Sequence, residues 1–213
     1  MRNTVPPSHE LWVCHLGHVP YYDGVAIQAT LRARRQAGEL PDTMLLLEHP
    51  PVYTRGRRAD AEDLPFPEDF YRAKGIDVAD TDRGGKLTYH GPGQLVGYPI
   101  LDLHRVGADI LLHIRNLERS LIAYLQTLGL ESEPGDPGFT GVWSSGAKVA
   151  AIGVKLNQRA VTSHGFALNL TSDLDTFNTG IVPCGLVGRR ATSVLELSGR
   201  RLDVEAAARD YAP

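Results

Sequence analysis

Cys184 is the residue whose type and setting best suit nucleophilic chemistry. It lies in the stretch IVPCG (181–185), where the proline before it and the glycine after it favour a loop that exposes the thiol. The only other cysteine, Cys14, follows Trp12 and Val13 and has the setting of a small buried side chain. Because free cysteines are more often structural than reactive, Cys184 becomes a candidate only with a partner that favours its thiolate.

Four basic residues are candidate partners for this thiol. Lys148 opens the mostly apolar stretch KVAAIGVK, where partial desolvation would perturb the pKa of its amine. Lys155 lies close to an expected turn, which leaves its amine in water. His90 and His164 each precede a glycine. The residues alone do not decide which of Lys148, His90 and His164 contacts Cys184.

The size of the possible gain in thiol reactivity indicates what a lysine partner would do. Lowering a thiol pKa by about two units raises its thiolate fraction about 25-fold at neutral pH. Intrinsic nucleophilicity falls about tenfold at the same time, so the net gain is only about threefold. A lysine beside the thiol is therefore better explained as a proton carrier in a two-step acyl transfer, and the pair would titrate jointly.

The glycine-rich stretch RGGKLTYHGPGQLVGYPI (83–100) is the second chemical feature. It surrounds Tyr89, His90 and Gln94 with five glycines and two prolines, which excludes a regular helix. The run LVGYPI has the composition of a strand. We therefore expect a glycine-lined loop, carrying His90 and Gln94, that opens onto a strand.

The elements that must position these residues follow from periodicity and turn signals. Strands are expected at 11–17, at 43–54 with a break at Pro50–Pro51, and at 139–143, 148–156 and 160–170, the last two forming a hairpin around 157–159. Helices are expected after Pro20 up to Gly38, at 109–128 with Gly129 as its cap, near Ser193 from its capping-box spacing to Glu196, and at 203–212. Residues 55–69 are expected to form a loop, and 133–138 a turn.

These elements predict the fold class. Strands that include an antiparallel hairpin, with few helices, favour an α/β (α+β) fold with a mixed β-sheet and flanking helices over a doubly wound parallel sheet. With 213 residues and no linker or repeat, we expect one domain spanning 1–213.

Composition bounds the function classes. A net charge of −3 argues against general nucleic-acid binding. The chain has no secretory signal and no apolar run long enough to span a membrane, so we expect a soluble cytoplasmic protein with reduced thiols. It has no HExxH motif, no cysteine pair and no GxxxxGK[ST] motif. We therefore expect no metal, no cofactor, no nucleic acid and no membrane partner.

Four motifs in order, RGGKLTYHGPGQLVGYPI, KVAAIGVK, SHGFALNL and IVPCG, closely resemble the lipoyl(octanoyl) transferase family. The resemblance covers about residues 11–200, and four motifs together are far more specific than HGPGQ alone. It implies the α/β fold that lipoate and biotin protein ligases share. It also implies transfer of octanoyl from octanoyl-acyl carrier protein to a lysine of a lipoyl domain, through a thioester on Cys184 with Lys148 as its partner.

The resemblance also implies a set of substrate-binding residues. They are Arg83, Gly84, Gly85, Lys86, Leu87, Thr88, Tyr89 and His90 in the first segment, Ala151, Ile152 and Gly153 in the second, and Gly165, Phe166 and Ala167 in the third. Gly91, Gln94 and His164 are expected to support them. Backbone N–H groups near Gly85, Gly91 or Gly165 are candidates to stabilise a thioester oxyanion.

The implied partners are octanoyl-acyl carrier protein as donor, and the lipoyl domains of 2-oxoacid dehydrogenases and the glycine cleavage H protein as acceptors. Such partners are typically acidic, so a local basic patch would have to attract them; the candidates are Arg32, Arg34, Arg35, Arg55, Arg57 and Arg58. Burying a C8 chain is worth on the order of 5 kcal/mol, and each methylene about 1–3 kcal/mol in discrimination. The alternatives are an ATP-dependent lipoate- or biotin-type ligase, a non-catalytic module that binds these partners, and a cysteine hydrolase.

Overall fold

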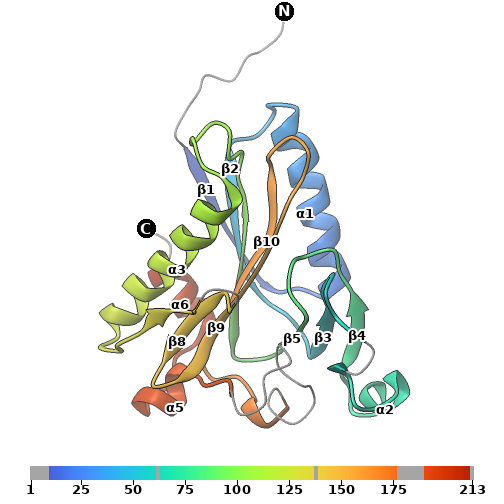
Figure 1. Cartoon of the computed structure of the whole chain (residues 1–213), viewed down its shortest axis with the longest axis vertical. Coiled ribbons are helices and arrows are strands. Elements are labelled where there is room, and N and C mark those ends of the chain that lie inside the picture. Colours follow the sequence, from blue (N-terminus) through green and yellow to red (C-terminus); the bar gives the residue numbers. More distant parts are fainter. Residues whose placement is uncertain (1–9, 61–62, 137–138, 177–189, 212–213) are drawn as a thin grey trace, which may run out of the picture.

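The computed structural model describes residues 10–60, 63–136, 139–176 and 190–211. In this part of the chain, a seven-stranded mixed sheet forms the centre and a three-stranded sheet lies beside it (Figure 1). The expected α/β fold with a mixed sheet and flanking helices is confirmed. Cys184 lies outside the described residues.

The larger sheet has the spatial order β1 (Leu11–His18), β2 (Asp42–Glu48), β6 (Gln94–Ile100), β10 (Thr162–Asn169), β9 (Ala147–Leu156), β8 (Gly141–Ser144) and β7 (Glu133–Pro134). Only β1 and β2 pair in parallel, and every other neighbouring pair is antiparallel. The expected hairpin is present as β9 and β10. The described helices are α1 (Tyr21–Gln36), α2 (Glu68–Arg72), α3 (Ile110–Thr127), α5 (Val194–Ser198) and α6 (Val204–Tyr211).

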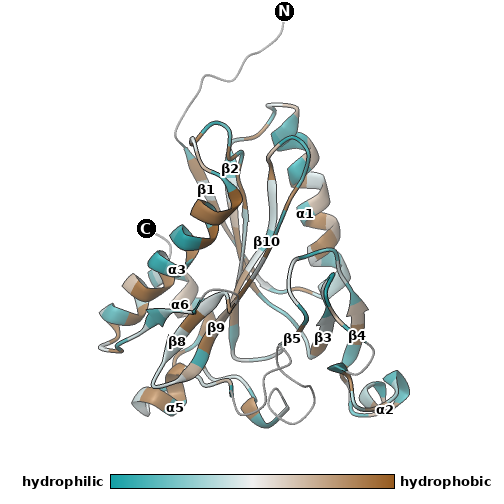
Figure 2. Ribbon diagram, viewed as in Figure 1, coloured by the Kyte–Doolittle hydropathy of each residue, from teal (hydrophilic) through white to brown (hydrophobic). Residues whose placement is uncertain are grey.

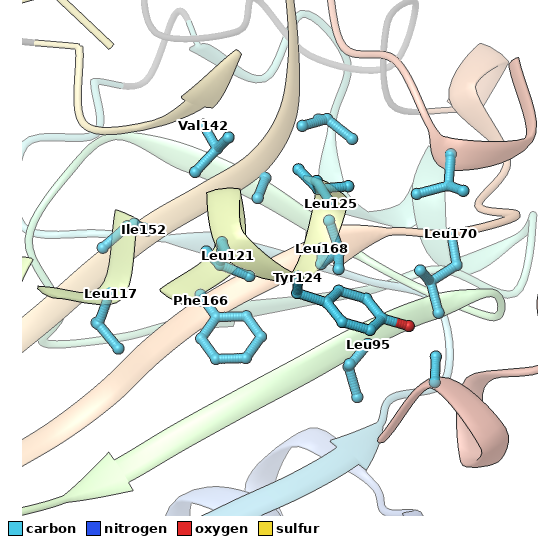
Figure 3. Packing of buried hydrophobic residues seen from close by; sticks show 14 of the residues in the cluster. Leu95, Leu117, Leu121, Tyr124, Leu125, Val142, Ile152, Phe166, Leu168 and Leu170 are labelled. Carbon is cyan, nitrogen blue, oxygen red and sulfur yellow. The ribbon is translucent and has the colours of Figure 1, made fainter. Parts of the chain in front are cut away.

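One face of the larger sheet packs against α3 and α6. The apolar positions predicted for the helix at 109–128 face the sheet, with Leu117, Leu121 and Leu125 buried in the main core cluster. Asp109 caps the start of α3 by accepting a hydrogen bond from Leu112 N at 2.8 Å. Hydrophobic stretches lie on β8, β9 and α3 (Figure 2). Figure 3 shows that Ile152 and Phe166 belong to this core, among the leucines of α3.

The opposite face of the sheet packs against α1, which confirms the helix expected between Pro20 and Gly38. Ile27 and Leu31 of α1 lie against a second cluster that includes Tyr98 and Ala167. Cys14 also contacts this cluster, but it is only half-buried. Its expected burial is therefore only partly met, because β1 is the edge strand of the sheet and is largely exposed.

The second sheet consists of β4 (Asp77–Asp80), β3 (Val52–Arg55) and β5 (Leu87–His90), in that order. It corrects two expectations. Residues 87–90 form a strand rather than a loop, because they pair with β3 despite the glycines around them. The loop expected over 55–69 ends in α2, which begins at Glu68 after Pro67, a residue suited to the start of a helix.

The C-terminal helices agree with the sequence. Ser193 caps α5, and its Oγ accepts the Glu196 N–H at 3.2 Å. The expected capping box is only half formed, since the Glu196 carboxylate accepts from Thr192 Oγ1 and Arg190 instead. The segment from Arg190 to Ser193, which follows Cys184 closely in the sequence, is thereby tied to α5.

Candidate active site

A cavity of about 170 Å³ lies between the α1 face of the larger sheet and the RGG loop (83–86) that leads into β5. Its walls come from the three segments that the sequence singled out. The predicted residues that line it are Arg83, Gly84, Gly85, Lys86, Leu87, Thr88, His90, Lys148, Ala151, Ile152, Gly153, His164, Gly165, Phe166 and Ala167. The fold therefore brings the segment 83–90 beside residues 148–167, which begin 58 positions further along the sequence.

Small residues form the floor of the cavity. Ala151 and Gly153 of β9 pair across the strands with Ala167 and Gly165 of β10. Alternate residues of a strand face opposite sides, so these four lie on the cavity face. Ile152 and Phe166 point the other way, into the core under α3 (Figure 3). These four residues, Ala151, Gly153, Gly165 and Ala167, form a strip without bulky side chains that leads away from Lys148.

A β-bulge turns Lys148 toward this strip. Strict alternation would place Lys148 on the core face with Ala150 and Ile152. The register between β8 and β9 slips here, since Trp143 pairs with Lys148 while its neighbour pairs with Ala150. Both Val149 and Ala150 consequently face the core, and Lys148 faces the cavity. Bulges beside active sites often redirect a side chain in this way.

The Lys148 amine is held at the β8 end of the cavity. Its Nζ donates a hydrogen bond to Thr140 O at 3.2 Å and lies 5.1 Å from the centroid of the Trp143 ring. Gly141 makes room for the side chain: a Cβ there would meet Ala150 O at 2.4 Å and Lys148 Cε at 3.4 Å, at a φ of +136°. Lys148 thus has a defined position in a half-buried setting.

The described chain resumes after Cys184 at Arg190, beside Lys148. Lys148 N donates to Arg190 O at 3.0 Å, and Thr192 N donates to Lys148 O at 2.9 Å, so that Ala191 forms a parallel bridge with Lys148. Only five residues lie between Cys184 and Arg190 in the sequence. The backbone of Lys148 therefore holds Arg190 and Thr192, a short distance along the sequence from Cys184.

His90 is buried and its tautomer is set by a hydrogen-bond chain. Gln94 Nε2 donates to Tyr89 O at 3.1 Å and to Asn169 Oδ1 at 2.9 Å, so Gln94 Oε1 must accept from His90 Nδ1, 2.8 Å away. Asn169 Nδ2 in turn donates to Thr192 O at 2.9 Å. Burial lowers the pKa of His90 well below its usual value, with His49 contributing. His90 is neutral near pH 7, and its Nε2 is an acceptor.

His164 reaches the cavity through an unusual backbone conformation. Alternation would place it on the core face with Phe166, but its φ is +57°, in the left-handed region. Its side chain lies on the cavity wall instead, where Nε2 is 2.8 Å from Asp82 Oδ1. Burial lowers the pKa of His164, although Asp82 opposes this shift. Asp82 also pairs with Lys155, and these two bonds outweigh its burial and lower its pKa.

The RGG loop is fixed tightly over the far part of the strip. Gly84 N donates to Val154 O at 3.1 Å, and Arg83 Nη2 donates to both Thr54 O and Thr54 Oγ1 at 2.7 Å. A Cβ on Gly153 would come within 3.1 Å of Gly84 O. The loop therefore lies close to the strip at this level and forms one wall of the cavity.

Three predicted residues do not line the cavity. Tyr89 packs against Tyr53 in the core of the second sheet, with ring centroids 5.4 Å apart. Gln94 acts behind His90, as described above. Gly91 lies outside the lining, so of the three glycines expected to offer N–H groups to an oxyanion only Gly85 and Gly165 are in place.

Sequence reasoning missed five lining residues, namely Tyr21, Arg58, Tyr98, Phe139 and Thr140. Tyr98 lies in the expected strand of the 83–100 stretch and Arg58 is one of the candidate arginines, but only the fold shows that these five residues line the cavity. Tyr98 donates its hydroxyl proton to His49 Nε2 at 2.9 Å, because His49 Nδ1 donates to Val19 O at 2.6 Å. No sequence motif indicated His49 either.

The fold places the protein in a class. It resembles lipoate-protein ligase A bound with ATP, with a TM-score of 0.73 and 17% identity over 95% of this chain and 84% of that chain. It also resembles biotin protein ligase from Aquifex aeolicus, with a TM-score of 0.50 and 12% identity over 96% of this chain and 66% of that one. At these identities the likeness shows the fold shared by lipoate and biotin protein ligases.

Sequence comparison narrows the class to a family. The model of the lipoyl protein ligase A/B catalytic domain matches residues 20–211. An octanoyltransferase from Gloeobacter violaceus is 49% identical over 85% of this chain and 78% of its own length, and one from Rubrobacter xylanophilus is 44% identical over 91% and 86%. The chain belongs to the octanoyltransferases, the acyltransferase members of this catalytic-domain family. In the described part of the chain, no helix is long and apolar enough to cross a membrane.

Proposed function

We propose that the protein, as a single catalytic domain in the cytoplasm, transfers octanoyl from octanoyl-acyl carrier protein to a lysine ε-amine of lipoyl domains. The acceptors would be the lipoyl domains of 2-oxoacid dehydrogenases and the glycine cleavage H protein. The reaction passes through a thioester on Cys184, with Lys148 as the proton carrier. One observation carries the proposal: Lys148 points into the cavity, and its backbone is hydrogen-bonded to Arg190 and Thr192, which follow Cys184 closely in the sequence.

Chain length supports this pairing. Six residues span at most about 20 Å when fully extended, so Cys184 lies within reach of the Arg190 anchor. Residues 190–192 run alongside Lys148 through two backbone hydrogen bonds. His90 and His164 have no comparable link to this segment through their own backbone among the described residues. Lys148 is therefore the preferred partner of the three candidates.

The first half-reaction moves the acyl group onto the enzyme. The neutral Lys148 amine takes the thiol proton of Cys184, and the thiolate attacks the carbonyl carbon of the donor thioester. A carbon–sulfur bond to Cys184 forms, and the carbon–sulfur bond to the carrier thiol breaks. Lys148 then returns the proton to the departing carrier thiolate, which leaves the amine neutral again.

The second half-reaction moves the acyl group to the acceptor. The acceptor amine attacks the carbonyl carbon of the Cys184 thioester, a carbon–nitrogen bond forms, and the bond to sulfur breaks. The attacking amine loses a proton to Lys148, which passes it to the Cys184 thiolate. Backbone N–H donors beside the thioester carbonyl would stabilise the oxyanion that forms in both steps.

Intact-protein mass spectrometry tests the proposal. The protein is mixed with octanoyl-acyl carrier protein without ATP, beside a Cys184→Ala variant. We expect one octanoyl adduct on the wild-type protein and none on the variant, and we expect a lipoyl domain to discharge the adduct. Loss of the nucleophile should lower transfer by at least about 1,000-fold.

Other outcomes assign the protein elsewhere. Octanoylation of the lipoyl domain that requires ATP and free octanoate would overturn the thioester route in favour of a ligase. An adduct that yields free octanoate in the presence of the lipoyl domain would indicate a hydrolase. Normal transfer by Cys184→Ala would remove Cys184 from the mechanism.

Two of the six candidate arginines form the basic patch that would meet acidic partners. Arg34, Arg35 and Arg55 are ion-paired within the chain, and Arg32 donates to Ser163 Oγ. Arg57 and Arg58 are exposed and form no ion pair with any residue that the structure describes. Arg58 lines the cavity, and the backbone of both arginines is hydrogen-bonded to the RGG loop.

Reversing these two charges should weaken use of a carrier-bound donor. For Arg57→Glu combined with Arg58→Glu, we expect kcat/KM for octanoyl-acyl carrier protein to fall about tenfold or more and to depend less on salt. Transfer from an octanoyl thioester of a small neutral thiol should change little. Arg34→Glu, at the far end of α1, is the matched control. An equal loss with both donors would show damage to the site and not to docking.

A further inference from the structure

We propose that His164 sets the upper limit of acyl-chain length, because its imidazole forms the wall between the acyl cavity and a second, smaller cavity behind it. The inference rests on the proposed function, since it assumes that the acyl group is attached near Lys148. It assigns to His164 a role in specificity and none in proton transfer.

His164 is shared by the two cavities. On one side it lines the cavity that contains Lys148. On the other side it lines a space of about 40 Å³ beside α1, together with Val25, Gln28, Ala29, Arg32, Asp82 and Ser163. It is the one residue common to both linings within the described part of the chain. Removing its ring would join the two spaces and extend the acyl cavity toward α1.

Several contacts hold the ring in this position against its backbone preference. A non-glycine residue in the left-handed region costs on the order of 1–3 kcal/mol and persists only where its surroundings fix it. His164 N donates to Gln28 Oε1 at 2.7 Å, and Nε2 is held by Asp82 at 2.8 Å. The ring also packs edge-on against Tyr98, with centroids 6.2 Å apart. The wall is therefore rigid, as a length limit requires.

Strand geometry places the wall at a suitable distance. His164 pairs with Val154, six residues beyond Lys148 on β9. Because one of these residues is the bulge, Lys148 and Val154 are separated along β9 by about five residue rises, or about 17 Å. An extended octanoyl chain advances about 9 Å from its carbonyl carbon, at about 1.25 Å per carbon–carbon bond. The remaining distance of about 8 Å is taken up by the thioester at one end and the imidazole at the other.

The floor between these two levels suits an alkyl chain. The small residues Ala151, Gly153, Gly165 and Ala167 lie along it without a branched side chain. The same distance argues against a catalytic role for His164. Its Nε2 is hydrogen-bonded to Asp82, while the Lys148 Nζ donates to Thr140 O.

The test uses two substitutions that tolerate the backbone conformation. Glycine adopts positive φ freely, and asparagine does so more readily than other residues. His164→Gly removes the whole ring, and His164→Asn removes only part of it. Ala160→Gly is the matched control, because Ala160 also has a positive φ, +56°, but lies in the turn before β10 and outside both cavities. Each variant is first checked for folding by thermal unfolding.

The readout is kcat/KM for octanoyl-, decanoyl- and dodecanoyl-acyl carrier protein with a lipoyl domain as acceptor. We expect the decanoyl-to-octanoyl ratio to rise at least about tenfold in His164→Gly, to rise less in His164→Asn, and to stay unchanged in Ala160→Gly. The dodecanoyl-to-octanoyl ratio should rise in His164→Gly as well. These shifts in ratio separate a length limit from a general loss of activity.

Two failures are distinguishable. If the wild-type protein does not transfer octanoyl, the proposed function is wrong and the inference falls with it. If the wild-type protein transfers octanoyl but folded His164→Gly and His164→Asn keep its chain-length ratios, the inference alone is overturned. A fall in kcat for every chain length at constant ratios would also overturn it, since it would give His164 a role in the chemical step.

Discussion

A Lys148→Arg variant should fold normally and lose transfer by at least about 100-fold. Arginine keeps the positive charge, so any purely electrostatic support of the Cys184 thiolate would survive. Its pKa lies above about 12, so it cannot give up and take back a proton near neutral pH. General acid–base groups typically contribute about 10²–10⁴-fold to rate. Both half-reactions would suffer, and single-turnover acylation and discharge should each be measured.

Lys155→Arg is the matched control for this variant. Both lysines lie on β9 and both are half-buried, but Lys155 pairs with Asp82 at the far end of the strand, and arginine can form the same ion pair. We expect it to retain most of the wild-type activity. Wild-type turnover in Lys148→Arg would remove Lys148 from the mechanism. A slow discharge with normal acylation would restrict its role to the second step.

The sequence predicted most of the larger sheet because the periodic signals there are strong. The helix at 109–128, the hairpin around 157–159 and the helix caps agree with the structure. Local patterns of apolar residues and turn residues decide these elements, and the neighbouring sequence carries all of that information. That three separate segments belong to one site was predicted only from the resemblance of their motifs to those of a known family.

The second sheet escaped prediction because its strands are short and depend on distant partners. Residues 87–90 form a strand only through pairing with β3, more than 30 residues earlier in the chain. Four residues between glycines carry too little periodicity to indicate this. Tertiary pairing outweighs local propensity in such strands.

The directions of Lys148 and His164 could not be predicted for a related reason. Alternation predicts that each lies on the core face, with Ile152 and Phe166 respectively. A bulge at Val149 redirects one, and a left-handed backbone at His164 redirects the other. Both exceptions occur at the cavity. Departures from a regular pattern of this kind are expected at functional sites, where backbone strain persists because it positions a functional side chain.

Gly165→Ala should destabilise the fold by about 3 kcal/mol or more. A Cβ at this position would lie 2.1 Å from Gly97 O and 2.6 Å from Pro99 Cδ. Both atoms belong to β6, which is hydrogen-bonded to β10 in the middle of the sheet, so neither can move away without breaking the pairing. For a chain of this size, we expect the midpoint of thermal unfolding to fall by roughly 6–12 °C.

Gly153→Ala is the informative comparison, because Gly153 is the cross-strand partner of Gly165 and shares its cavity face. Its Cβ would meet Arg83 Cδ and Gly84 O, each at 3.1 Å, so these neighbours need to shift by only a few tenths of an ångström, far less than at Gly165. We expect a change in stability below about 1 kcal/mol and a KM for the donor raised about tenfold, with kcat less affected. If instead both variants lost stability equally, the loop would be as rigid as the sheet. If neither changed KM or stability, the acyl group could not lie along this strip.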